Sequence, residues 1–150
     1  ARDAGNAVLF SDEQGSGLAS LTRRRLDHID IRFDIEEAVR TIRFEDYCHD
    51  SLGEAPVRLC KLDIEGHELE ALAGFGRALR SVGLIQFEFG GCNIDTRTFF
   101  QDFWYFFQDQ GFDLFRLTPL GPVPIPTYRE TDERFSTTNF FARNRSFPRS

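Results

Sequence analysis

The sequence predicts an α/β fold, because a strand pattern changes to a helix pattern near Gly66 and a second strand pattern follows. Residues 57–62 form a short, mostly apolar run of the kind found in strands. From His67 to Arg80, apolar residues recur every three or four positions, as on one face of a helix. Residues 84–89 form another short apolar run. A strand, a helix and a strand within about 30 residues predict a βαβ unit with parallel strands.

The later segments complete a mostly parallel sheet with flanking helices. Residues 97–110 place aromatic side chains at helical spacing, which predicts a helix that covers one face of the sheet. Strand patterns follow at 112–117 and 137–142, and the last strand is close enough in sequence to pair antiparallel with the one before it. Residues 118–126, rich in Pro and Gly, are expected to be an irregular loop. The whole of 1–150 is expected to form one domain.

Composition excludes several classes of function. The net charge of -6 disfavours nucleic acid and anionic membranes as partners. The short basic run Arg23–Arg25 is expected to be a solvated surface, although it could also contact an anionic ligand. No apolar run approaches the ~18 residues of a membrane span. Three cysteines without CxxC spacing indicate neither a disulfide framework nor a zinc knuckle and favour the cytoplasm.

Polar side chains near the ends of the two parallel strands indicate a site. Side chains two residues apart in a strand point to the same face, so Lys61 lies with Asp63 and Gln86 with Glu88. A parallel strand covered on both faces should be apolar throughout, and these two strands are not. Ligands of open α/β sheets bind beyond the carboxyl ends of the strands, where these polar groups lie. The alternative is a buried Lys61–Glu88 ion pair that only completes the structure.

The turn after the first parallel strand supplies further candidates. His67 is expected at the start of a helix, where the helix dipole keeps the imidazole neutral and able to accept a proton from a hydroxyl. The alternative is that Glu65 and His67 only cap the helix. Asp63, Glu65 and Glu88 could instead offer oxygen ligands to Mg²⁺ or Ca²⁺. A zinc site of the HExxH type is excluded because position 71 is alanine.

The run from Lys61 to Glu68, followed by the motifs at 85–90 and 93–100, resembles the later part of FkbM-type methyltransferases. The similarity extends over residues 7–143. It implies a Rossmann-like class I fold and an enzyme that moves a methyl group from S-adenosylmethionine to a hydroxyl. The acceptor would be a small molecule such as a sugar, a polyketide or a related metabolite.

The resemblance also implies roles for the residues at the strand ends. Lys61 and Asp63 would contact S-adenosylmethionine. Asp63, Glu65 and His67 would be catalytic, and Glu65 or His67 would accept the hydroxyl proton. Glu88 and Asn93 would bind and orient the acceptor, and no metal is expected.

In this family a glycine-rich cofactor loop and an acidic residue for the ribose precede the segment where this chain begins. We therefore expect the C-terminal part of a longer enzyme, inactive on its own. An exposed sheet edge left by missing strands could promote a homodimer. Two alternatives remain open: a non-catalytic module that binds a partner, and an enzyme that depends on a carboxylate-bound metal.

Overall fold

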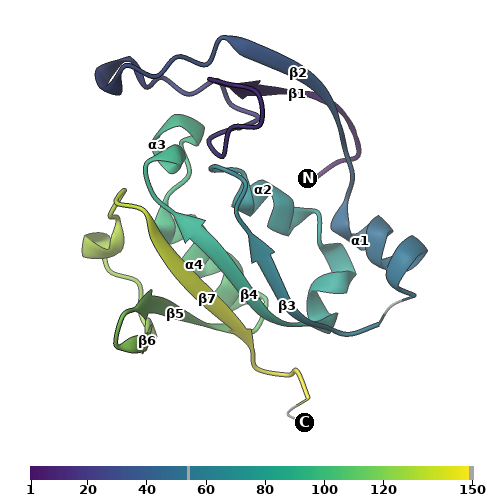
Figure 1. Cartoon of the computed structure of the whole chain (residues 1–150). Helices are drawn as coiled ribbons and strands as arrows, with labels where there is room; N and C mark the ends of the chain where they lie inside the picture. The colour runs from purple at the N-terminus through teal and green to yellow at the C-terminus, as the bar shows by residue number, and fades with distance from the viewer. Residues whose placement is uncertain (54, 149–150) are drawn as a thin grey trace.

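The chain forms a five-stranded sheet, helices that pack on one face of it, and a separate two-stranded ribbon (Figure 1). A computed structural model describes residues 1–53 and 55–148. The strands are β1 (Gly5–Ser11), β2 (Ile35–Thr41), β3 (Val57–Leu62), β4 (Val82–Phe89), β5 (Phe112–Thr118), β6 (Gly121–Pro124) and β7 (Thr138–Asn144). The α-helices are α1 (Phe44–Tyr47), α2 (Glu68–Ala73), α3 (Cys92–Thr96) and α4 (Phe100–Asp109). The remaining helical segments, of 3-10 or π type, are η1 (Asp27–Ile29), η2 (Cys48–Leu52), η3 (Gly76–Ser81) and η4 (Glu130–Asp132).

The sheet has the order β3-β4-β7-β5-β6. β3 and β4 are parallel, which confirms the predicted βαβ unit. The antiparallel last strand is also confirmed, since β7 runs antiparallel to β5. The expected mostly parallel sheet is not confirmed, because β7 lies between β4 and β5 and is antiparallel to both. β3, β4 and β5 therefore point the same way, although β3–β4 is the one parallel pairing in the described sheet.

The segment expected to be an irregular loop contains a strand. β6 pairs antiparallel with β5 at the edge of the sheet. Pro122 and Pro124 fit this place because an edge strand leaves one row of backbone groups without a ladder partner, so the missing N–H groups cost little. The prediction failed because proline was taken as evidence against any strand.

The helix expected over 67–80 is divided in two. α2 ends at Ala73, and η3 begins at Gly76 with a φ of 49°. The carboxylate of Glu45 occupies the place where a Cβ of residue 76 would lie, and the backbone N–H of Glu45 donates to the Gly74 carbonyl. The left-handed φ of Gly76 favours glycine at this position and interrupts the helix beside α1.

The helix α4 begins later than expected, and its first turn is held by distant residues. The Asp102 carboxylate accepts a hydrogen bond from the Phe99 N–H. Glu133 accepts from the N–H groups of Phe100 and Gln101, both at 2.9 Å. These bonds satisfy the donors that a helix start leaves open. Among residues 1–53 and 55–148, no helix has the length and apolar character needed to cross a membrane.

Phenylalanine side chains join α4 to the centre of the sheet, which confirms that most of the aromatic residues predicted over 97–110 belong to the core; Phe99, before the helix, does not. On β4, Phe87 and Phe89 are fully buried. The ring of Phe103 stacks on Phe87 at a centroid distance of 4.8 Å and meets Phe89 edge-on. Leu72 and Leu79 of the crossover join the same core, so α2, η3 and α4 cover one face of the sheet.

Replacing Phe103 with alanine should lower the free energy of unfolding by about 3–5 kcal/mol, because it leaves a cavity in a fully buried layer. Phe99→Ala is the matched control, since this ring is 50% exposed; its cost should stay below about 1 kcal/mol. Urea unfolding of both variants tests the difference. Equal losses would contradict the assignment of Phe103 to the core.

Candidate functional site

The carboxyl ends of β3 and β4 bring three predicted site residues together. One carboxylate oxygen from each of Asp63, Glu65 and Glu88 lies within 4.8 Å of the others. Lys61 is in register with Gln86, so the polar side chains predicted to share a face do so. The three carboxylates form a set that could hold a cation or accept hydrogen bonds from a ligand. We refer to Asp63, Glu65 and Glu88 as the acidic edge.

Lys61 forms an ion pair with Asp63 and not with Glu88. Its Nζ lies 2.7 Å from Asp63 Oδ2, and both side chains are about half exposed. This hydrogen bond, aided by the negative charge of Asp63, raises the pKa of Lys61. The alternative of a buried Lys61–Glu88 ion pair is therefore not what the described structure forms. Burial raises the pKa of Glu88, and the nearby charges of Asp63 and Glu65 act in the same direction.

Arg24 is the principal site residue that the sequence did not reveal. Its Nη1 lies 2.8 Å from Glu65 Oε2 and its Nε lies 3.2 Å from Asp95 Oδ2. The Arg24 side chain is 10% exposed, so the prediction of a solvated basic run is wrong for this residue and fits Arg25, which is 91% exposed. Burial raises the pKa of Glu65, and the charge of Arg24 opposes that shift.

The substitution Arg24→Gln should reduce the free energy of unfolding by about 1–3 kcal/mol, because it leaves two largely buried carboxylates without their cation. Arg25→Gln makes the same change at the adjacent exposed position and should cost no more than about 0.5 kcal/mol. Chemical denaturation at neutral pH gives both values. If Arg25→Gln were the more harmful variant, the ion pairs of Arg24 with Glu65 and Asp95 would not support the fold.

Glu68 fixes the turn that presents Asp63 and Glu65. Its side chain is fully buried, and its Oε1 accepts hydrogen bonds from the N–H groups of Ile64 at 3.0 Å and Gly66 at 3.3 Å. Within the described part of the chain, Oε2 has no partner. Glu65 has a φ of 52°, a left-handed conformation that is costly for a residue with a side chain. The buried carboxylate holds this turn in place.

Burial raises the pKa of Glu68 in the folded chain. Glu68 therefore contributes stability that is complete below the ordinary carboxyl pKa and is lost as pH rises through the higher folded-state pKa. Glu68→Gln keeps an accepting oxygen but cannot ionise. The unfolding free energy of the wild type minus that of Glu68→Gln should fall as pH rises from about 4 to about 8.

Urea titrations across this pH range measure that difference. Glu70→Gln removes an exposed carboxylate from the same helix and controls for the general loss of a negative charge. A difference between wild type and Glu68→Gln that stays constant with pH would show that Glu68 carries no such pKa shift.

His67 lies at the start of α2 but does not cap it. No side-chain hydrogen bond caps this helix, and the Glu65 carboxylate is bonded to Arg24. The capping alternative is therefore not supported. Instead, His67 Nε2 lies 3.0 Å from the hydroxyl of Thr22. Burial lowers the pKa of His67, which favours the neutral imidazole.

Asn93 supports the turn after β4. Its side chain is fully buried, and its Oδ1 accepts a hydrogen bond from the Gly90 N–H at 2.9 Å. Its Nδ2 is buried without a partner among the described residues. Sequence reasoning placed Asn93 near the site without this supporting role, and its contact with an acceptor stays a prediction.

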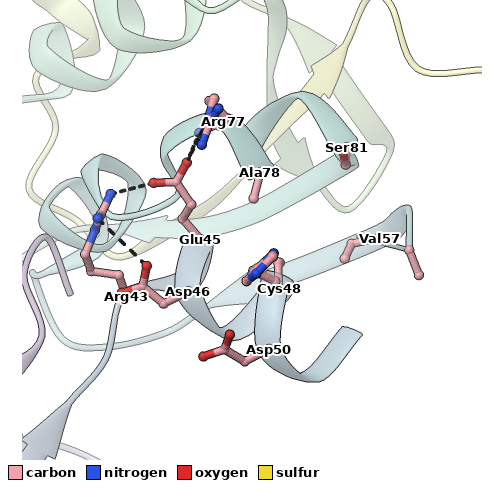
Figure 2. A pocket seen from close by; sticks show the side chains of 11 residues that line it. Arg43, Glu45, Asp46, Cys48, Asp50, Val57, Arg77, Ala78 and Ser81 are labelled. Atoms are coloured by element: carbon pink, nitrogen blue, oxygen red, sulfur yellow. Dashed lines mark hydrogen bonds and ion pairs between the residues drawn. The ribbon is translucent and has the colours of Figure 1, made fainter. Parts of the chain in front are cut away.

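Two cavities lie at opposite ends of β3. One, of about 300 Å³, is bordered by Ile64 and His67 beside the acidic edge. The other, of about 680 Å³, lies at the amino end, bordered by Val57 and by residues of α1, η2 and η3. Figure 2 shows its charged wall, where Glu45 joins Arg43 and Arg77. The larger cavity is therefore not the one beside the predicted site.

The Methyltransferase FkbM domain family matches residues 4–114, which include all of the acidic edge, Arg24 and Asn93. The chain belongs to this family. The resemblance inferred from the run Lys61–Glu68 is thereby confirmed, although the FkbM match ends within β5 and leaves β6 and β7 outside it. Searches among curated proteins and among solved structures gave no match. FkbM membership supports a methyltransferase function in general terms.

Proposed function

We propose that the protein transfers the methyl group of S-adenosylmethionine to a hydroxyl of a small molecule such as a sugar, a polyketide or a related metabolite. The observation that supports this most directly is the acidic edge, together with the half-buried His67 on the turn after β3, in a member of a methyltransferase family. A carboxylate set next to a neutral imidazole can hold a cationic methyl donor and accept a proton from an alcohol.

The residues at the strand ends fit such a donor chemically. S-adenosylmethionine supplies an electrophilic methyl group on a positively charged sulfonium, together with an amino-acid end that has both charges. The acidic edge attracts positive charge, and Lys61 with Asp63 offers an ammonium and a carboxylate side by side. We therefore assign cofactor contacts to Lys61 and Asp63.

The chain's own residues would align the acceptor and receive its proton. His67 is the better candidate for the base, because burial keeps it neutral whereas the Glu65 carboxylate is bonded to Arg24. Glu88 and Asn93 would orient the acceptor from the end of β4 and the turn that follows. Alignment of a hydroxyl and exclusion of water supply much of the rate enhancement in displacements of this kind.

Calorimetric titration with S-adenosylmethionine tests the proposal. It should be run on residues 1–150 and on a form of the protein that also carries the glycine-rich loop implied by the family resemblance. Asp63→Asn should weaken binding at least tenfold in the chain that binds. Asp113→Asn is the matched control, because Asp113 is also a partly exposed, ion-paired carboxylate but lies at the start of β5. Absence of binding by both chains would refute the proposal.

A divalent metal is the second candidate ligand of the acidic edge, since its three oxygens lie close enough to share an ion. The guanidinium of Arg24 is already ion-paired with Glu65, so a metal would compete with Arg24 for this carboxylate. We expect S-adenosylmethionine binding to persist after dialysis against a chelator. Loss of binding that Mg²⁺ restores would favour the metal-dependent alternative, and binding that is indifferent to Asp63→Asn would favour a non-catalytic module.

A further inference from the structure

The 300 Å³ cavity beside His67 has mainly aliphatic walls. It lies between α2 and the segment that includes β1 and residues 19–21. Its apolar lining comes from Leu9, Leu21, Ile42 and Ile64, together with three alanines. A volume of this size is at the lower end of the roughly 300–1,000 Å³ found for small-molecule sites. The cavity therefore suits a compact, apolar molecule.

Most polar groups in the wall are already bonded within the protein. The Ser20 hydroxyl donates to the Glu65 carbonyl, and the Thr41 hydroxyl lies within hydrogen-bond distance of the Asp3 and Gly5 carbonyls. The Glu70 carboxylate pairs with Arg2. His67 differs, because its bond to Thr22 uses Nε2, and no bond to Nδ1 is found within the described residues.

The cavity lies next to the turn that carries Asp63 and Glu65, although none of the three carboxylates of the acidic edge lines it. Ile64, which lines it, lies between Asp63 and Glu65 in the chain. The Ser20 hydroxyl, at 2.9 Å from the Glu65 carbonyl, joins the cavity wall to the same turn. A molecule whose body fills the cavity would therefore have one end at His67, on the same turn as Asp63 and Glu65.

We propose that this cavity binds the body of the methyl acceptor, and that the acceptor is an alcohol with a mainly aliphatic body. The inference rests on the function proposed above and narrows its substrate class. A sugar would bring several hydroxyls against aliphatic walls, and each buried hydroxyl without a partner is unfavourable. An alcohol with a single hydroxyl would place its carbon skeleton against Leu9, Leu21 and Ile64 and its oxygen at His67.

The test uses two probes with similar six-membered rings, cyclohexanol and methyl glucoside, added to ¹⁵N-labelled protein. Cyclohexanol should shift the amide signals of Ala19, Leu21 and Ile64, and the ring signals of His67, in a saturable way. Methyl glucoside at the same concentrations should not. Ala71→Leu, which fills the cavity, should weaken cyclohexanol binding at least tenfold.

Ala78→Leu makes the same change in the wall of the 680 Å³ cavity and should leave cyclohexanol binding intact. Because Ala71 is buried and Ala71→Leu could disturb packing, Ile64→Ala serves as a second variant at a 39% exposed residue and should weaken binding about threefold. Equal binding of the glucoside, shifts confined to the larger cavity, or wild-type binding in both cavity variants would overturn the proposal.

Calorimetry with S-adenosylmethionine separates this inference from the proposed function. Cofactor binding without cyclohexanol binding would overturn the cavity assignment and leave methyl transfer in place. Cyclohexanol binding without any cofactor binding would overturn the acceptor role together with the proposed function.

Discussion

The alternation of side chains along β4 determines where both the core and the candidate site lie. Ile85, Phe87 and Phe89 are fully buried against the helices, and the intervening side chains face the other side of the sheet. Gln86 and Glu88 belong to that second set. A shift of one residue in the pairing with β3 would exchange the two sets and bury a carboxylate in the phenylalanine layer. The packing of the core therefore fixes the register that places the acidic edge.

The turn after β3 is held in an unfavourable conformation by groups that are themselves costly to bury. Glu65 adopts a left-handed backbone, and the fully buried Glu68 binds the N–H groups on both sides of it. Such a carboxylate loses the solvation of water and recovers only part of it through two hydrogen bonds. Backbone strain and the burial of a carboxylate are typical of functional sites, because they fix the direction of side chains such as Asp63 and Glu65.

Local patterns in the sequence predicted the features whose partners are close in the chain. The βαβ unit, the aromatic face of α4 and the shared side of Lys61 and Asp63 follow from periodicity alone. Arg24 could not be found in this way, because its partners lie 41 and 71 residues further along the chain. Glu68 was missed for a different reason: a carboxylate in the first turn of a helix is ordinarily explained by the dipole, and only the fold shows that it is buried.

The site is formed partly by the carboxyl ends of β3 and β4 and partly by the segment between β1 and β2, which belongs to a weakly stable part of the fold. β1 and β2 form a two-stranded ribbon with mostly exposed side chains, and an isolated ribbon of this kind is marginally stable. The segment between these strands is attached to the turn after β3 by Arg24 at Glu65, by Ser20 at the Glu65 carbonyl and by Thr22 at His67. A cationic ligand that approaches Glu65 competes with Arg24 for the same carboxylate. Ligand binding at the edge and attachment of this segment are therefore thermodynamically linked, and each must alter the other by the same free energy.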